Sequence, residues 1–215
     1  MHIPDGFLDA KTFVALDVVG AGFVAVAAAR VRRVLNERAV PLMAVLAAFI
    51  FAAQMLNFPV AGGTSGHFCG GALAAVLLGP WAGVLVMTLV LVIQALAFGD
   101  GGILALGANV FNMAVVAPFV GYGLYRLIRR VWRTEAGRFA GSFAGAWLAV
   151  VAAATACALE LAVSGTTPLA VVLPAMVGVH AVIGLGEGVI TAAALAAVRV
   201  SRPDLLELAR GGGAQ

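Results

Sequence analysis

Three histidines, His2, His67 and His180, are the residues in this chain best suited to binding a transition metal. His2 follows Met1, so a single ion can be chelated by the α-amine of Met1 and by the backbone nitrogen and imidazole Nδ1 of His2. The chelate rings formed have five and six members. Binding through a deprotonated backbone nitrogen favours the square-planar nitrogen geometry typical of Ni²⁺ or Cu²⁺. The first two residues therefore predict a three-nitrogen metal chelate.

His67 is the obvious fourth nitrogen donor. It ends the sequence GGTSGH at 62–67, where glycines permit close approach of the backbone. Other interpretations stay open: His2 as an ordinary terminal residue, and His67 as a cap of the helix expected from Phe68. His180 lies in an apolar stretch, and we interpret it as a hydrogen-bond partner between helices in preference to a ligand.

The composition requires a lipid environment for the elements that position these residues. Hydrophobic residues make up 63% of the 215, charged residues only 11%, and the mean hydropathy is +1.07. A soluble domain carries about 25% charged residues. The two cysteines, Cys69 and Cys157, lie in apolar stretches, which excludes a disulfide framework or a cysteine-rich metal cage.

Seven apolar segments predict an all-α, polytopic bundle of about seven transmembrane helices, because a span needs about 17–25 apolar residues. They cover residues 13–29, 39–56, 68–79, 81–98, 109–125, 140–163 and 169–198. The third is short enough to be a partial or strongly tilted helix, and Pro174 predicts a kink or an early break in the last. We expect one transmembrane domain over 1–200 and a cytoplasmic tail over 201–215.

The basic residues set the expected orientation in the membrane. All except Lys11 fall in three clusters: Arg30, Arg32, Arg33 and Arg38; Arg126, Arg129, Arg130, Arg133 and Arg138; and Arg199, Arg202 and Arg210. With seven spans all three clusters share one side, which the positive-inside rule makes cytoplasmic. The N-terminus and segments 57–67, 99–108 and 164–168 then face outward. This pattern reflects membrane topology and excludes a nucleic-acid-binding face.

The first ten residues do not look like a secretory signal. They contain no Lys or Arg and two acidic residues, whereas a signal peptide begins with positive charge followed by an apolar run. We therefore expect Met1 to be the first residue of the mature protein, which the terminal chelate requires.

Several polar residues interrupt the apolar spans and should face the bundle interior with partners, because burying them in lipid is costly. They are Asp17, Gln54, Gln94, Asn109, Asn112, Glu160 and Glu187. We expect Asn109, Asn112 and the nearby loop residue Asp100 to support the metal ligands from behind, holding the N-terminal segment and His67 in place. A proton relay through Asp17, Glu160 and Glu187 is the competing interpretation. It is weakened because these three acids lie on three different predicted helices.

Six sequence motifs together resemble one family. They are MHIPDGFL at 1–8, GGTSGH at 62–67, GALAAVLLGPWAG at 71–83, QALAFGDGG at 94–102, LGANVFNM at 106–113 and GLGEG at 184–188. Covering nearly the whole chain, they resemble the substrate-capture subunits of energy-coupling-factor cobalt and nickel importers, the CbiM/NikM type. The resemblance implies a seven-helix fold whose inserted N-terminal segment carries the metal, with Met1, His2 and His67 as ligands.

The same resemblance implies partners in a bacterial inner membrane: a transmembrane scaffold subunit, a pair of cytoplasmic ATPases and a small accessory membrane subunit. The chain has no GxxxxGK(S/T) phosphate loop, so ATP hydrolysis is expected in another subunit. Ala21, Ala25 and Ala29 put small residues on one face of the first helix, suited either to scaffold docking or to internal packing.

The transported ion is expected to be Co²⁺ or Ni²⁺, with no organic cofactor. Some family members continue into an extra accessory domain, whereas this chain ends at residue 215, which favours the cobalt type. The alternatives are a nickel subunit of the same transporter type and a self-sufficient metal/proton antiporter. An antiporter predicts clustered carboxylates and an inverted repeat, neither of which the sequence has. A membrane metalloprotease is disfavoured because there is no HExxH.

Overall fold

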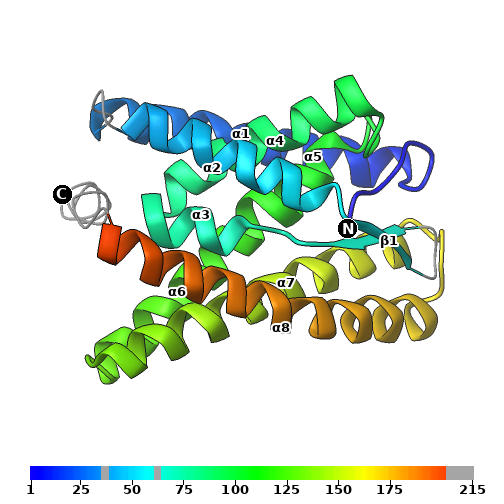
Figure 1. Cartoon of the computed structure of the whole chain (residues 1–215). Helices are drawn as coiled ribbons and strands as arrows, with labels where there is room; N and C mark the ends of the chain where they lie inside the picture. Colours follow the sequence, from blue (N-terminus) through cyan, green and yellow to red (C-terminus); the bar gives the residue numbers. More distant parts are fainter. Residues whose placement is uncertain (35–38, 61–63, 202–215) are drawn as a thin grey trace.

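The structure, a computed structural model, describes residues 1–34, 39–60 and 64–201 (Figure 1). Of the tail expected over 201–215, Ser201 belongs to α8, and residues 202–215 lie outside the described residues. The elements follow in chain order as α1 (Ala10–Val34), α2 (Ala39–Gln54), β1 (Asn57–Val60), β2 (Thr64–His67), α3 (Gly71–Leu78), α4 (Pro80–Ile93), the π-helix η1 (Gln94–Phe98), α5 (Leu106–Asn109), the π-helix η2 (Val110–Val116), α6 (Ala117–Val131), α7 (Glu135–Val163) and α8 (Leu169–Ser201).

The predicted helical membrane architecture is confirmed in its coarse form. Each of the seven apolar segments coincides with a helix or a run of joined helices. Five helical stretches of the described chain are long and apolar enough to cross a membrane: Ala10–Arg33, Pro80–Phe98, Leu106–Val131, Glu135–Val163 and Leu169–Ser201. The helices α2 and α3 are shorter, so the number of crossings stays a prediction. Pro174 does not break α8, which runs unbroken through it.

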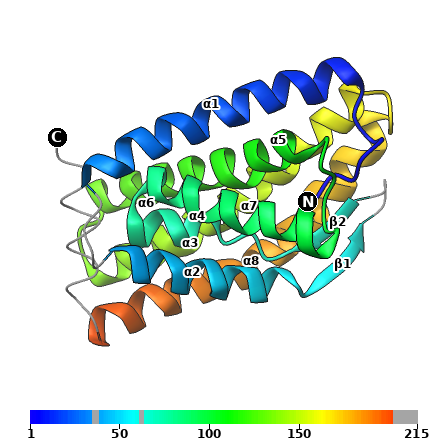
Figure 2. The same ribbon diagram turned by 90° about the horizontal axis from the view of Figure 1, so that it is seen from above.

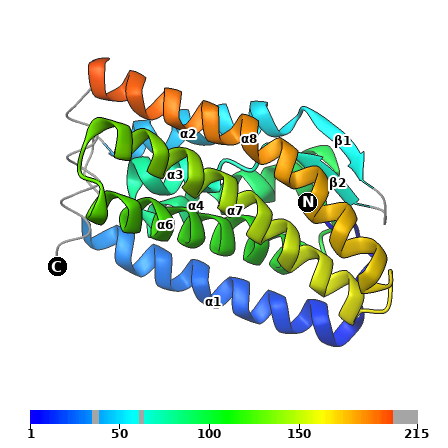
Figure 3. The same ribbon diagram turned by 90° about the horizontal axis from the view of Figure 1, so that it is seen from below.

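The short helix α3 lies at the centre of the bundle. It packs against α4, α6 and α7, and its residues from Gly71 to Leu77 are buried. Figure 2 and Figure 3 show the long helices α1, α7 and α8 running lengthwise around it. It ends at Gly79, whose φ of +87° suits glycine, and Pro80 then begins α4 at a position where its missing N–H is not needed.

A β-hairpin departs from the all-helical expectation. The strands β1 and β2 pair antiparallel, with Asn57 opposite His67 and Val60 opposite Thr64. The hairpin packs on α8, where Gly66 lies against Ile183 and Val179. Pairing satisfies the backbone of a segment that leaves a helix inside a membrane protein. His67 consequently sits on a paired strand and not in an open loop.

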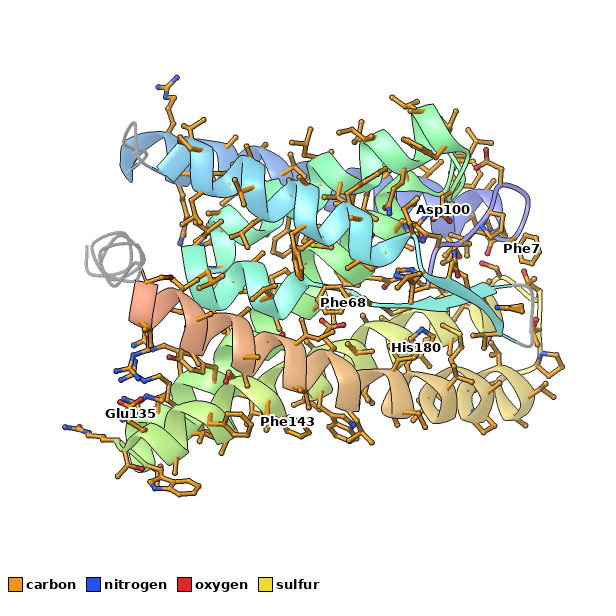
Figure 4. The ribbon with its side chains drawn as sticks, viewed as in Figure 1. Phe7, Phe68, Asp100, Glu135, Phe143 and His180 are labelled. Carbon is orange, nitrogen blue, oxygen red and sulfur yellow. The ribbon has the colours of Figure 1, made fainter. Side chains whose placement is uncertain are left out.

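The segments expected to face outward all meet at one end of the bundle. Thr166 donates a hydrogen bond from Oγ1 to the carbonyl of Phe7, which ties the α7–α8 turn to the N-terminal segment. At the other end Glu135, at the start of α7, pairs with Arg138 and with Arg199 near the end of α8. Figure 4 shows Phe7 and Glu135 at opposite ends of the molecule. The fold thus separates the N-terminal end from the arginine-bearing end.

Candidate metal centre

The chain terminus is buried inside the protein. Met1 and Ile3 are fully buried and His2 is 4% exposed. The α-amine of Met1 donates to the backbone carbonyl oxygen of Ser65 and, at 3.1 Å, to its Oγ. Because burial disfavours the charged form, the pKa of this amine falls from 8.0 to about 6. At neutral pH the amine is therefore largely uncharged, with a lone pair that can bind a metal.

The imidazole of His2 is held in one tautomer. Its Nε2 lies 3.0 Å from Oε1 of Gln94, and because a carbonyl oxygen only accepts, Nε2 carries the proton. Nδ1, the atom required by a terminal chelate, then carries the lone pair. Oδ1 of Asp100 lies 3.4 Å from Nδ1 and puts negative potential beside it. Burial lowers the pKa of His2 to about 3, so the ring is neutral at pH 7.

The imidazole of His67 is held in the opposite tautomer to that of His2. Its Nδ1 donates to the carbonyl oxygen of Phe68 at 2.7 Å, which leaves the lone pair on Nε2. Within the described residues Nε2 has no hydrogen-bond partner, and the side chain is fully buried. Burial lowers the pKa of His67 well below 6.5. The ring stacks on that of His2, with centroids 4.5 Å apart and planes tilted by 26°.

The segment after His2 is clamped through its backbone. Asn109 accepts from the N–H of Ile3 at 2.8 Å and donates to its carbonyl oxygen at 3.1 Å, as a neighbouring strand would. Gly102 donates to the same carbonyl oxygen at 2.8 Å. These bonds fix the direction in which the first two residues enter the bundle.

Asp5 anchors the next turn of the segment. Its carboxylate accepts from the N–H groups of Ile103 at 3.1 Å and Leu104 at 2.8 Å. A Cβ on Gly102 would lie 2.1 Å from Oδ1 of Asp5, so only glycine allows this approach. The loop after η1 is therefore shaped to receive the N-terminal segment.

Among the predicted supporting residues, Asn109 bonds the N-terminal segment, Asp100 lies beside His2, and Asn112 bonds a glutamate of α7. Asn112 donates to Oε2 of Glu160, on α7, at 2.6 Å. His180 uses Nδ1 to bond the carbonyl of Met176, one turn earlier in α8, at 2.7 Å. The same ring also lies next to the backbone of Ser65.

The structure also identifies two contacts that sequence reasoning missed. The sequence marks Gln94 only as a polar residue in an apolar span, and Ser65 only as part of a glycine-rich loop. The signal for Gln94 was a lone amide in an apolar span. No sequence signal marks Ser65, since its role comes from the hairpin that turns its carbonyl toward Met1.

Together these contacts collect three neutral nitrogen donors: the Met1 amine, His2 Nδ1 and His67 Nε2. His2 is buried and not a loose terminal residue, and the N-cap of α3 is Gly70 and not His67. The lone pairs of the two imidazoles lie in their ring planes, and these planes are stacked. One ion can therefore bind both rings only after one of them turns.

Comparison with known proteins points to metal transport. The family model described as the cobalt uptake substrate-specific transmembrane region matches residues 2–205. A putative fused nickel transport protein NikMN of Archaeoglobus fulgidus is 47% identical over 212 residues, covering 96% of this chain and 68% of that protein. A cobalt transport protein CbiM of Sorangium cellulosum is 38% identical over 216 residues, covering 96% and 95%. The crystal structure of a transition metal transporter, 42% identical, matches with a TM-score of 0.87 over 93% of both chains.

The lowered pKa values predict that the protein without bound metal loses stability as the pH falls. Between pH 8.0 and about 6 the unfolded chain takes up a proton on the terminal amine that the folded chain excludes. Between pH 6.5 and about 3 the same holds for His2. Because the unfolded state binds more protons, the free energy of unfolding decreases as the pH falls. Thermal unfolding midpoints of detergent-purified protein at pH 8, 6.5 and 5 measure this slope.

The matched control for this prediction is His2→Ala. Its midpoint should fall less steeply between pH 6.5 and 5, while its slope between pH 8 and 6.5 keeps the contribution of the amine. Parallel curves for the two proteins over the whole range would contradict the assignment to His2.

Proposed function

Since the chain belongs to the family of cobalt uptake substrate-specific transmembrane regions, we propose that it is the membrane subunit that captures Co²⁺ or Ni²⁺ for uptake. The observation that carries this proposal is the buried chain terminus. A free α-amine, an N-terminal histidine and His67 lie together in the protein, all in the protonation state that a metal requires.

The proposed ligands are Met1, through its amine, and His2 and His67, through their imidazoles. Gln94 supports His2 by keeping the proton on Nε2, and Asp100 compensates part of the positive charge of the ion. Loss of the amide proton of His2 would add a further nitrogen to the chelate. Binding would then release this amide proton, and the ion would replace the stacking of the two rings with bonds to both.

Both Co²⁺ and Ni²⁺ suit this donor set. Raw affinity of nitrogen ligands rises from Co²⁺ to Ni²⁺, and the relatives carry the names of both metals. The preference for cobalt stays a prediction, which competition between the two ions on the purified protein tests directly.

Uptake against a gradient requires partners. The sequence contains no phosphate-binding loop, so we assign ATP hydrolysis to cytoplasmic ATPase subunits that act through a transmembrane scaffold, with a small accessory subunit. Ala21, Ala25 and Ala29 on α1 are exposed and do not pack inside the described chain. Their small side chains would allow a scaffold helix to approach closely.

A metal/proton antiporter is a weaker candidate because the acids of the apolar helices, Asp17, Glu160 and Glu187, each bond a different partner. Asp17 accepts from the N–H of Gly107 at 2.8 Å, where α1 meets α5. Glu160, on α7, accepts from Asn112, and Glu187, on α8, accepts from the backbone N–H groups of Cys69 and Gly70. Each carboxylate has its own local partner, which is typical of structural bonds and not of a shared proton path.

Orientation in the membrane gives a first prediction for this function. If ions are captured from outside, the N-terminal end faces outward and the arginine-bearing end faces the cytoplasm. Lys11 and Arg133 are exposed at these two ends, and both native cysteines are buried. A membrane-impermeant maleimide should label Lys11→Cys in intact cells and Arg133→Cys only after lysis. The reverse pattern would contradict this orientation.

The terminal chelate predicts that residues added before Met1 abolish tight metal binding. An extension converts the amine into an amide and has no room around a fully buried Met1. We expect an N-terminal tag and His2→Ala each to weaken binding of Co²⁺ and Ni²⁺ at least about 100-fold, since chelation is lost. His67→Ala should open one ligand position and also bind weakly. Calorimetric titration of purified protein with each ion measures these effects.

The same tag placed after Gln215 is the matched control and should leave affinity unchanged. His180→Ala tests the interpretation of His180 as a packing residue and should retain most of the affinity. Full stoichiometry and affinity in the N-terminally tagged protein would rule out the amine as a ligand.

The partner subunits predict how accumulation depends on energy. In proteoliposomes the purified chain alone should bind Co²⁺ without concentrating it. Co-reconstitution with the scaffold, ATPase and accessory subunits should give accumulation that requires ATP. Uphill uptake by the chain alone would favour the antiporter.

A further inference from the structure

The backbone just after His67 is held by a buried carboxylate from a distant helix. Glu187, on α8, is 1% exposed, and its two carboxylate oxygens accept from the N–H of Cys69 at 2.6 Å and from the N–H of Gly70 at 2.9 Å. These N–H groups lie at the start of α3, where a helix leaves its first donors without partners inside the helix. Two backbone N–H groups bonded to the two oxygens of one buried side chain make this a specific attachment.

A second helix holds the same turn from the other side. Nε2 of Gln54, at the end of α2, donates to the carbonyl oxygen of Cys69 at 2.6 Å. Gly70 has a φ of +81°, and a Cβ there would lie 2.7 Å from Cγ2 of Ile50 on α2. The turn is therefore fixed between α2 and α8 and has no freedom to rotate.

The peptide group between Phe68 and Cys69 connects this attachment to the metal site. Its N–H donates to Glu187, and its carbonyl oxygen accepts from Nδ1 of His67 at 2.7 Å. The peptide group is planar, so fixing the N–H also fixes the direction of the carbonyl. A carboxylate on the N–H also polarises the group and strengthens the carbonyl as an acceptor. Glu187 is thus linked to the His67 ring through one peptide unit.

We propose that Glu187 is a positioning residue for the metal site, acting on His67 through the Phe68–Cys69 peptide. This inference rests on the proposed function, since it assigns Glu187 a role in binding the captured ion. The carboxylate, the peptide and the imidazole form a relay that keeps the proton on Nδ1 and directs Nε2 toward the ion. A direct carboxylate–histidine pair serves the same purpose at many metal sites.

A purely structural role for Glu187 makes a different prediction. If the carboxylate only caps α3, its loss lowers stability and reduces metal affinity by the same factor whether or not His67 is present. If it acts through His67, its effect on affinity disappears once His67 is removed. A double-mutant cycle separates the two roles.

The cycle comprises the unmodified protein, Glu187→Gln, His67→Ala and the double variant, each titrated with Ni²⁺ alone in detergent. Glutamine keeps one acceptor oxygen and presents an N–H₂ to the other backbone donor. We expect Glu187→Gln to weaken Ni²⁺ binding about 10–100-fold in the native background and less than about threefold in the His67→Ala background. The ligand-field absorption of bound Ni²⁺ should shift in Glu187→Gln toward the spectrum of His67→Ala.

Glu160→Gln is the matched control, because Glu160 is also a buried glutamate but bonds Asn112 and, in the part of the chain that the structure describes, makes no hydrogen bond to residues 65–70. It should leave both affinity and spectrum unchanged. If Glu187→Gln does not fold, Glu187→Asp replaces it in the cycle. Aspartate keeps the carboxyl group but withdraws it from the two backbone N–H groups, and its effect on affinity should show the same dependence on His67. Equal losses in both backgrounds, or no loss, would overturn the proposal. Failure of the unmodified protein to bind Ni²⁺ or Co²⁺ would contradict the proposed function instead.

Discussion

The buried amine of Met1 is the constraint on which the rest of the structure depends. A chain terminus normally carries a charge and lies in water, so placing it inside a membrane protein requires neutralisation and hydrogen-bond partners. The structure supplies Ser65 as acceptor, and burial lowers the pKa of the amine to about 6. Every neighbouring element then has to leave space for the first residues and to satisfy their backbone groups.

The polar side chains of the bundle meet this requirement by bonding backbone. Asn109 bonds both the N–H and the carbonyl oxygen of Ile3, and Asp5 accepts from the backbone N–H of Leu104 in the loop after η1. Gln54 and Glu187 hold the turn after the hairpin. Irregular backbone inside a membrane protein is stable only where such partners exist. The few polar residues in the spans are thus used mainly to allow the chain to leave regular helix near the candidate metal site.

The sequence was sufficient for the helices and insufficient for the irregular segments. Apolar runs of about 20 residues, punctuated by Gly79-Pro80 and by arginine clusters, predict the bundle because lipid imposes length and composition on a span. The hairpin could not be predicted, since its short strands are stabilised by packing on α8 and not by a pattern of their own. A single amide in a helix, such as Gln94 or Asn112, indicates that a partner exists but not which one. The structure pairs Gln94 with His2 and Asn112 with Glu160.

The bond between Phe7 and Thr166 has a consequence for biogenesis. The ribosome makes the N-terminal segment first, yet Thr166 and the other groups that hold the segment emerge much later. The segment therefore cannot adopt its final position while most of the helices are still being synthesised and inserted. Its insertion is a late step of assembly, and any enzymatic processing of the terminus has to be completed during this interval, before the amine is enclosed.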